Sequence, residues 1–228
     1  MKRAQQGFTL VEIAIVLVII GLLLGGILKG QEMITQAKIK NIMADFSGIS
    51  AAYHGYQDRY RAIPGDDPGA ARWPGGVVST SGTTGNGVVS GTYNNVCPAV
   101  IVAGSPESCN FWAHLRLAGF VSGSGGSQPF NAVTGLIGVQ TGDGAGGATM
   151  MDAQATPQGF SGLIICSANI PDKIAAAVDT QMDDGIGNTG TLRALLQTVP
   201  NPNIGAGQAA TPAYLETGGN IYTLCRSL

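Results

Sequence analysis

Residues 8–28 read FTLVEIAIVLVIIGLLLGGIL, an apolar run that only Thr9 and Glu12 interrupt. About twenty apolar residues are needed to cross the hydrocarbon core of a bilayer as a helix. A secretory signal peptide has a shorter apolar stretch, roughly 7–15 residues, which ends in small residues at a cleavage site. This run is longer and ends in the bulky pair Ile27 and Leu28. We therefore expect a membrane-spanning helix and not a conventional cleaved signal peptide.

The helix is predicted to continue well beyond the membrane. No proline occurs before Pro64, and the apolar residues after the membrane span are spaced alternately by three and four positions, as on one face of an amphipathic helix. We predict a single helix over residues 8–60, about 80 Å long. Gly25, Gly26 and Gly30 each cost up to about 1 kcal/mol of helix propensity, so we expect the helix to bend or melt near them. The apolar stripe consists of Ile39, Ile42, Phe46, Ile49, Tyr53, Tyr56 and Tyr60.

Glu12 is unusual because it lies inside the apolar run. An ionisable side chain within a bilayer costs roughly 2.5–3.5 kcal/mol on insertion scales and therefore needs a partner. Residues 8–28 contain no Lys, Arg or His. If the chain were cut before Phe8, the new α-amino group would be a cation four residues from Glu12. It could then meet the carboxylate of its own chain or of a neighbouring chain.

Residues 7–12 (GFTLVE), after a short basic leader and before an apolar helix, resemble the processing motif of type IV pilins and type II secretion pseudopilins. The resemblance implies that a prepilin peptidase cleaves after Gly7 and that the new N-terminus, Phe8, is N-methylated. It also implies that Glu12 pairs with the Phe8 amine of an adjacent subunit during filament assembly. The chain departs from many pilins at Lys29, where they carry a proline. The alternative interpretation is a plain signal-anchor helix with a chance glutamate.

The resemblance also implies where the protein is found and what it contacts. Residues 1–7 are a cleaved leader, residues 8–60 the long helix with 8–28 as transmembrane segment and filament core, and residues 61–228 the head. The chain is expected to cross the inner membrane once, with a cytoplasmic N-terminus and a periplasmic head, and then to enter a pilus or pseudopilus filament. The implied partners are other pilin or pseudopilin subunits, prepilin peptidase and an inner-membrane assembly platform. The net charge of −2 offers no electrostatic case for binding nucleic acid.

Residues 61–228 have a different composition, with most of the 35 glycines and all 4 cysteines. The boundary is the proline and turn cluster at residues 62–68, AIPGDDP. A segment of about 170 residues can bury a sizeable core of its own. We predict the α+β class, with the long N-terminal helix packed on a C-terminal antiparallel β-sheet head, as in type IV pilins. The short elements are expected as a helix with Ser105 as N-cap and Gly119 at its end, a helix from 169–172 to 183–185, and strands over 136–141, 159–166 and 220–226.

The cysteines are expected to form disulfides. Four cysteines allow three pairings, and export past the inner membrane favours disulfides over metal ligation. We predict the pairing that is local in the sequence, Cys97 with Cys109 and Cys166 with Cys225. The second bridge would tie the last strand to the buried strand before it, similar to the C-terminal disulfide of many pilins. Four free buried thiols are the alternative.

Residues suited to catalysis are few. The chain has two histidines, His54 on the long helix and His114 on a short one, and neither lies beside a Cys or Ser motif. No Gly-x-Ser-x-Gly sequence and no phosphate-binding loop occur. We therefore expect that the protein is not an enzyme. His54 is expected to face solvent or to pack beside the tyrosine stripe.

Two groups of aspartates are candidate ligands for calcium, a hard cation that takes several oxygen ligands. They are Asp66 with Asp67, and Asp179 with Asp183 and Asp184. Some pseudopilins carry calcium in the head, so the resemblance permits such a site. The EF-hand spacing is missing, however, and aspartates at a helix end before a glycine form ordinary turns. We expect no cofactor and no metal.

Three functions remain to be compared. The favoured one is a structural subunit, either a pilin, a minor pilin or a pseudopilin, that assembles into a type IV pilus or a type II secretion pseudopilus. Gly21, Gly25 and Gly26 suit close packing of helices in such a filament. The alternative is a membrane-anchored, adhesin-like binding protein whose glycine-rich loops contact a ligand. A membrane-anchored enzyme is the third, and the sequence supplies almost none of the convergent His, Asp and Ser residues that it would need.

Overall fold

The computed structural model describes residues 9–152 and 158–228. Its first element, helix α1, runs without a break over Leu10–Tyr60, close to the predicted bounds. Gly25, Gly26 and Gly30 are helical, so the expectation that the helix melts there is wrong. Each glycine costs only about 1 kcal/mol, and the leucine- and isoleucine-rich turns around them propagate the helix through all three.

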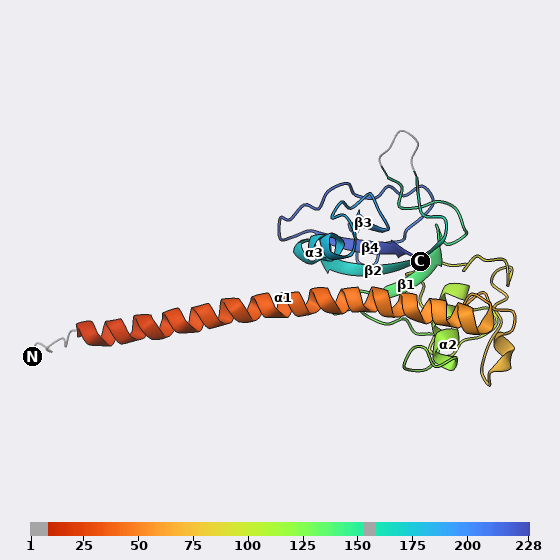
Figure 1. Cartoon of the computed structure of the whole chain (residues 1–228), viewed down its shortest axis with the longest axis horizontal. Helices are drawn as coiled ribbons and strands as arrows, with labels where there is room; N and C mark the ends of the chain where they lie inside the picture. Colours follow the sequence, from red (N-terminus) through yellow and green to blue (C-terminus); the bar gives the residue numbers. More distant parts are fainter. Residues whose placement is uncertain (1–8, 153–157) are drawn as a thin grey trace, which may run out of the picture. The chain divides into compact units, whose positions relative to one another are not determined.

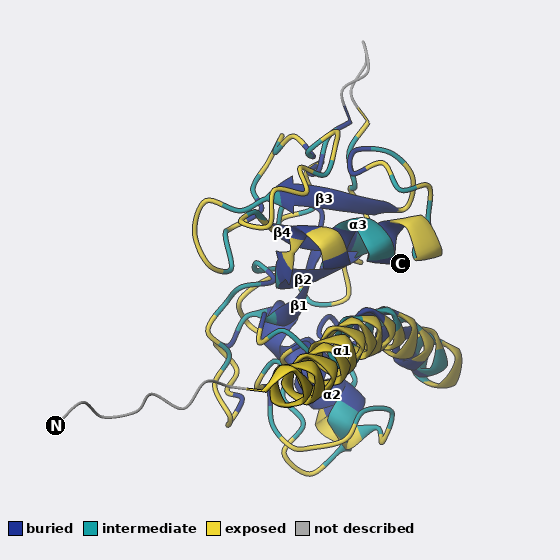
Figure 2. Cartoon of the chain, turned by 90° about the vertical axis from the view of Figure 1, so that its left-hand side faces the viewer, coloured by how far each residue is buried: buried dark blue, intermediate teal, exposed yellow. Residues whose placement is uncertain are grey.

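The two halves of α1 belong to different compact units. The first unit ends at Lys38, and the second comprises Ile39–Leu228. Within the second unit, the predicted stripe on α1 is confirmed: its first six members are buried and Tyr60 is partly buried. Figure 2, coloured by burial, shows that the residues of α1 change from exposed to partly buried on one face along the helix. Because a buried large side chain contributes about 1.5–3 kcal/mol, this stripe holds the helix firmly in the head.

A four-stranded antiparallel sheet forms the centre of the head (Figure 1). Its strand order is β1-β2-β4-β3, so the last strand of the chain lies inside the sheet. A long N-terminal helix followed by an antiparallel sheet confirms the predicted α+β, pilin-like class. The strands are β1 Ile137–Thr141, β2 Leu163–Pro171, β3 Leu192–Leu196 and β4 Ile221–Ser227.

The predicted strands differ from the structure in two places. The strand expected over residues 159–166 begins only at Leu163 and continues to Pro171, through the residues that were expected to open a helix. Strand β3 was not predicted at all. Its sequence, LRALL, lacks the alternation of apolar and polar residues that marks a half-exposed strand, because most of its residues are buried.

Three helical segments accompany the sheet: the short 3₁₀ helix η1 at Ala70–Arg72, α2 at Glu107–Leu117 and α3 at Asp172–Met182. The predicted N-cap of α2 is wrong, because Pro106 occupies that position and gives no side-chain cap. The hydroxyl of Ser105 instead accepts a hydrogen bond from the N–H of Val102 at 3.1 Å. The predicted end of α3 at residues 183–185 is confirmed.

The sheet separates two hydrophobic clusters. Successive residues of β2 alternate between them, as the side-chain period of a strand requires: Ile165 packs with the α1 stripe, and its neighbours Ile164 and Cys166 face the opposite cluster. Phe111 and Trp112 of α2 join the cluster on the α1 side. The C-terminal half of α1, α2 and one face of the sheet therefore make one continuous core.

Candidate functional site

The N-terminal half of α1 exposes an apolar surface all round. Residues 9–29 are exposed throughout, and the exposed fraction reaches 91% at Leu10 and 74% at Leu22. In the part of the chain that the structure describes, α1 is the helix whose length and composition suit a membrane span. An apolar surface of this extent must be covered by lipid or by other protein. It is therefore the surface on which function is expected to depend.

Glu12 takes part in a reciprocal cap at the start of this helix. The N–H and the hydroxyl of Thr9 both donate to Glu12 Oε2, each at 2.8 Å. In return, the N–H of Glu12 donates to Thr9 Oγ1 at 3.3 Å. This arrangement is a capping box, and it satisfies two N–H groups that the first helical turn leaves without partners. The sequence signal of this cap is the pattern Thr-x-x-Glu before an apolar run, and our predictions did not include it.

The Glu12 carboxylate has no cationic side chain beside it among the described residues. The ion pairs found there are Lys29 with Glu32 and Arg72 with Asp67. The predicted cleavage and methylation positions, Gly7 and Phe8, lie outside the described residues. The cap uses one carboxylate oxygen, so the other oxygen of Glu12 is left for a partner from outside this stretch of helix.

A family model described as the prokaryotic N-terminal methylation motif matches residues 2–28. The chain carries the N-terminal methylation motif of type IV pilins and pseudopilins. Pilin-family proteins are structural subunits and not enzymes, which agrees with the expectation for this chain. Neither the curated proteins nor the solved structures contain a match. The pilin motif and the exposed apolar helix together are consistent with anchoring in the inner membrane before filament assembly.

The head contains both predicted disulfides. Cys97 is bonded to Cys109, which fastens a loop to α2, and Cys166 is bonded to Cys225. Cys166 and Cys225 lie directly opposite each other in the pairing of β2 with β4. The second bridge therefore ties the last strand to its buried neighbour, as predicted.

His114 in the head is a structural residue. It is fully buried, accepts a hydrogen bond from the N–H of Gly65 on Nδ1 at 3.0 Å, and donates from Nε2 to the carbonyl oxygen of Val77 at 2.9 Å. Only glycine fits at position 65, where φ is +93° and a Cβ would lie 2.5 Å from the carbonyl oxygen of Glu107. His54 is exposed on α1, with its ring 5.1 Å from that of Tyr53. Neither histidine has a catalytic arrangement.

Asp66 is fully engaged in holding the turn after α1. This buried carboxylate accepts hydrogen bonds from the N–H groups of Gly85 and, at 2.7 Å, Gly87. It thereby holds the glycine-rich loop 82–91 against the turn. Asp66 was a candidate calcium ligand, but its carboxylate oxygens instead bind the backbone of this loop.

The carboxylate of Asp67 is also buried. It accepts hydrogen bonds from the Arg72 guanidinium on both oxygens, at 2.6 and 3.1 Å, and from the Tyr56 hydroxyl at 2.5 Å. Burial alone would raise the pKa of Asp67, but the hydrogen bonds from Arg72, Tyr56 and the Gly69 N–H outweigh it and lower the pKa. The carboxylate thus joins α1 to η1, and its ligand positions are taken by protein donors.

Asp179, Asp183 and Asp184 do lie together, with carboxylate oxygens within 4.8 Å of one another. Burial, followed by the charges of Asp184 and Asp183, raises the pKa of Asp179 to about 6, although a hydrogen bond from the Tyr214 hydroxyl at 2.6 Å opposes the rise. The carboxylates of Asp183 and Asp184 accept hydrogen bonds from backbone N–H groups of the segment that follows α3. Each aspartate therefore has a structural role at the end of α3.

Proposed function

We propose that this protein is a pilin, minor pilin or pseudopilin subunit of a type IV pilus or a type II secretion pseudopilus. The observation that supports it is the methylation motif over residues 2–28, placed at the start of a helix whose N-terminal half exposes apolar side chains on all sides. In a membrane, lipid covers this surface. In a filament, the same surface is covered by the helices of other subunits, so one helix serves both states.

The processing steps follow from the motif. Prepilin peptidase cleaves after Gly7, removes the leader of residues 1–7, and Phe8 becomes the methylated N-terminus. The mature chain then consists of the helix to residue 60, with 8–28 as membrane span and filament core, and the head of residues 61–228. Glu12 pairs with the Phe8 amine of an adjacent subunit, and its cap on Thr9 holds the carboxylate at the start of the helix for that contact.

Before assembly the chain crosses the inner membrane once, with its N-terminus in the cytoplasm and its head in the periplasm. Its partners are other pilin or pseudopilin subunits, prepilin peptidase and the inner-membrane assembly platform. The two disulfides of the head support this orientation, because such bonds form in the oxidising periplasm.

The experiment is intact-mass analysis of the protein from its native host, together with electron microscopy of sheared surface filaments. We expect loss of residues 1–7, gain of one methyl group, and this chain among the filament proteins. Replacing Gly7 by a bulky residue should leave an uncut precursor in the inner membrane. A wild-type mass that retains residues 1–7 would contradict the proposal.

A further inference from the structure

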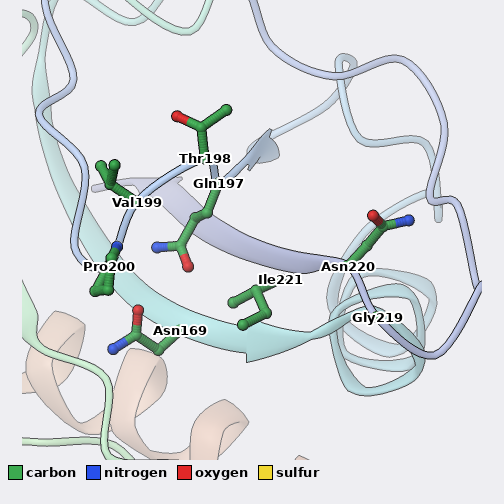
Figure 3. Close-up of a pocket in the computed structure, with 8 residues that line it drawn as sticks. All are labelled: Asn169, Gln197, Thr198, Val199, Pro200, Gly219, Asn220 and Ile221. Carbon is green, nitrogen blue, oxygen red and sulfur yellow. The ribbon is translucent and has the colours of Figure 1, made fainter.

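A pocket of about 180 Å³ opens at the end of the sheet where β3 ends and β4 begins (Figure 3). Side chains from three separate parts of the chain meet there, and none of them is charged. Three carry an amide, and two offer exposed aliphatic surface, Val199 at 56% and Ile221 at 43%. The lining residues are Asn169, Gln197, Thr198, Val199, Pro200, Gly219, Asn220 and Ile221.

A β-bulge brings Asn169 to this pocket. The pairing of β2 with β4 shifts register between Ser167 and Ile170, and Asn169 has a left-handed backbone with φ of 57°. Bulges of this kind turn a side chain away from the regular alternation of a strand and are frequent beside binding sites. Figure 3 shows the side chains of Asn169, Gln197 and Ile221 close together, with Asn220 on the other side of Ile221.

Each of the three amides is held at one end by a hydrogen bond within the head. The bonds of Asn169 and Asn220 are to backbone groups and fix which end of each amide is oxygen, whereas the Thr223 hydroxyl can pair with either end of the Gln197 amide. All three bonds restrict the side chain before any ligand binds. The bonds run from the N–H of Asn201 to Asn169 Oδ1 at 3.3 Å, from Gln197 Nε2 to Thr223 Oγ1 at 2.7 Å, and from Asn220 Nδ2 to the carbonyl oxygen of Leu215 at 2.7 Å.

The other end of each amide is available. Asn169 Nδ2, Gln197 Oε1 and Asn220 Oδ1 have no hydrogen-bond partner among residues 9–152 and 158–228. The pocket thus presents the Asn169 donor and the Gln197 amide beside the aliphatic side chain of Ile221, while the Asn220 amide points away from them (Figure 3). A few polar groups in fixed positions on an apolar wall are typical of a small-molecule site.

We propose that this pocket binds a neutral sugar unit. Sugar hydroxyls both donate and accept, so one ring can pair with the amides of Asn169 and Gln197. The C–H face of the ring can rest on Ile221. The lack of charge in the lining disfavours ionic ligands, and the volume is below the range of about 300–1,000 Å³ of sites for larger ligands.

An extended peptide fits this site less well. Peptides that add to a sheet bind through free backbone groups at a strand edge. Here the N–H of Gln197 already donates to the carbonyl oxygen of Ile221 at 2.8 Å, which extends the β3–β4 pairing into the pocket wall. The available groups are side-chain amides, which suit hydroxyls.

The test is saturation-transfer NMR on the full chain in a detergent without a sugar headgroup. D-glucose, D-galactose, D-mannose and N-acetyl-D-glucosamine are each added at about 10 mM, because a small site with few polar contacts binds in the millimolar range. The variants are Asn169→Gly, which suits the left-handed backbone, and Gln197→Ala. Gln181→Ala, on the exposed side of α3, is the matched control.

We expect saturation transfer to at least one of these sugars with wild type and with Gln181→Ala. Each pocket variant should bind that sugar about fivefold more weakly, the effect of one net hydrogen bond. Unchanged circular dichroism of the variants will show that the sheet is intact. Absence of transfer to all four sugars, or equal transfer in all variants, would overturn the proposal. Transfer only to a neutral Gly-Ser tetrapeptide in a parallel sample would overturn it as well.

Discussion

The Nδ1 atom of His114 accepts a hydrogen bond from the backbone N–H of Gly65 at 3.0 Å, while its Nε2 atom donates to the carbonyl oxygen of Val77 at 2.9 Å. One ring nitrogen accepts and the other donates, so the ring must be neutral in the folded head. The charged groups that act on it are Asp67 and Arg72. Burial lowers the pKa of His114 below its ordinary 6.5, and the hydrogen bond to Val77 and the charge of Asp67 only partly oppose this effect.

His114 should make the head less stable in acid. Its folded pKa lies below its unfolded pKa, so its contribution is present above pH 6.5 and is lost as the pH falls through the folded value. Between pH 6.5 and the folded pKa, where the unfolded chain binds this proton and the folded head does not, stability falls by at most about 1.4 kcal/mol per pH unit. Urea unfolding between pH 7.5 and 5 should give a steeper loss for wild type than for His114→Gln. His54→Gln is the control, and equal pH slopes in wild type and His114→Gln would contradict the assignment.

Asp179 should respond to pH in the opposite direction. Its folded pKa is raised to about 6 from 3.8, so its contribution is present below pH 3.8 and is lost as the pH rises through 6. Asp179→Asn keeps the shape, can still pair with the Tyr214 hydroxyl, and removes one of three neighbouring negative charges. We expect this variant to be more stable than wild type by about 1–2 kcal/mol at pH 8 and to lose that advantage at pH 4. A destabilised variant at pH 8 would show that the carboxylate is needed in its charged form.

The two disulfides should differ in their effect on stability. Cys97 and Cys109 are separated by 12 positions, and Cys166 and Cys225 by 59. On the loop-entropy model these bridges stabilise the head by about 3 and 4 kcal/mol, respectively. The double alanine variant of Cys166 and Cys225 should therefore have the lower Tm by calorimetry. A lower Tm for the Cys97 and Cys109 variant would mean that the loop it fastens matters more than the entropy of the unfolded chain.

The helix and its stripe could be predicted from the sequence because their signals are local. The alternating spacing from Ile39 to Tyr60 needs no knowledge of the rest of the chain, and all of the stripe is buried or partly buried. Strand β3 gave no such signal. Its Arg193 is buried and donates through Nη1 to the carbonyl oxygens of Met150 and Gln158, both at 2.6 Å. These partners are distant in the chain, so the local sequence LRALL could not predict that the arginine is buried.

The proposed functional residues also differ in how far the sequence alone could predict them. The motif around Glu12 is a continuous stretch, so the sequence alone identified it. The pocket at the end of the sheet combines Asn169, Gln197 and Asn220, which are ordinary amides far apart in the chain. Only the bulge in β2 and the pairing of β3 with β4 bring them together.

Glu12 forms the cap on Thr9 and, in our proposal, supplies a charge for assembly, and three variants separate these two contributions. Thr9→Val removes the hydroxyl bonds but keeps the carboxylate and its bond to the backbone N–H of residue 9. Glu12→Gln keeps an oxygen that can cap the same N–H but has no charge. Glu12→Ala removes both. Each variant should still be inserted and cleaved, which intact mass will check, because loss of a charge makes membrane residence easier.

If the charge serves assembly, Glu12→Gln and Glu12→Ala should both lose filaments while Thr9→Val retains them. An unpaired Phe8 amine in an apolar filament core costs roughly 3–5 kcal/mol, which disfavours each addition of a subunit by a factor of hundreds or more. Loss of a cap costs only about 1 kcal/mol and leaves the helix intact. Filament yield from sheared cells, at equal protein levels, is the measurement. Normal filaments from Glu12→Gln would show that the cap suffices and would remove the assembly role of the charge.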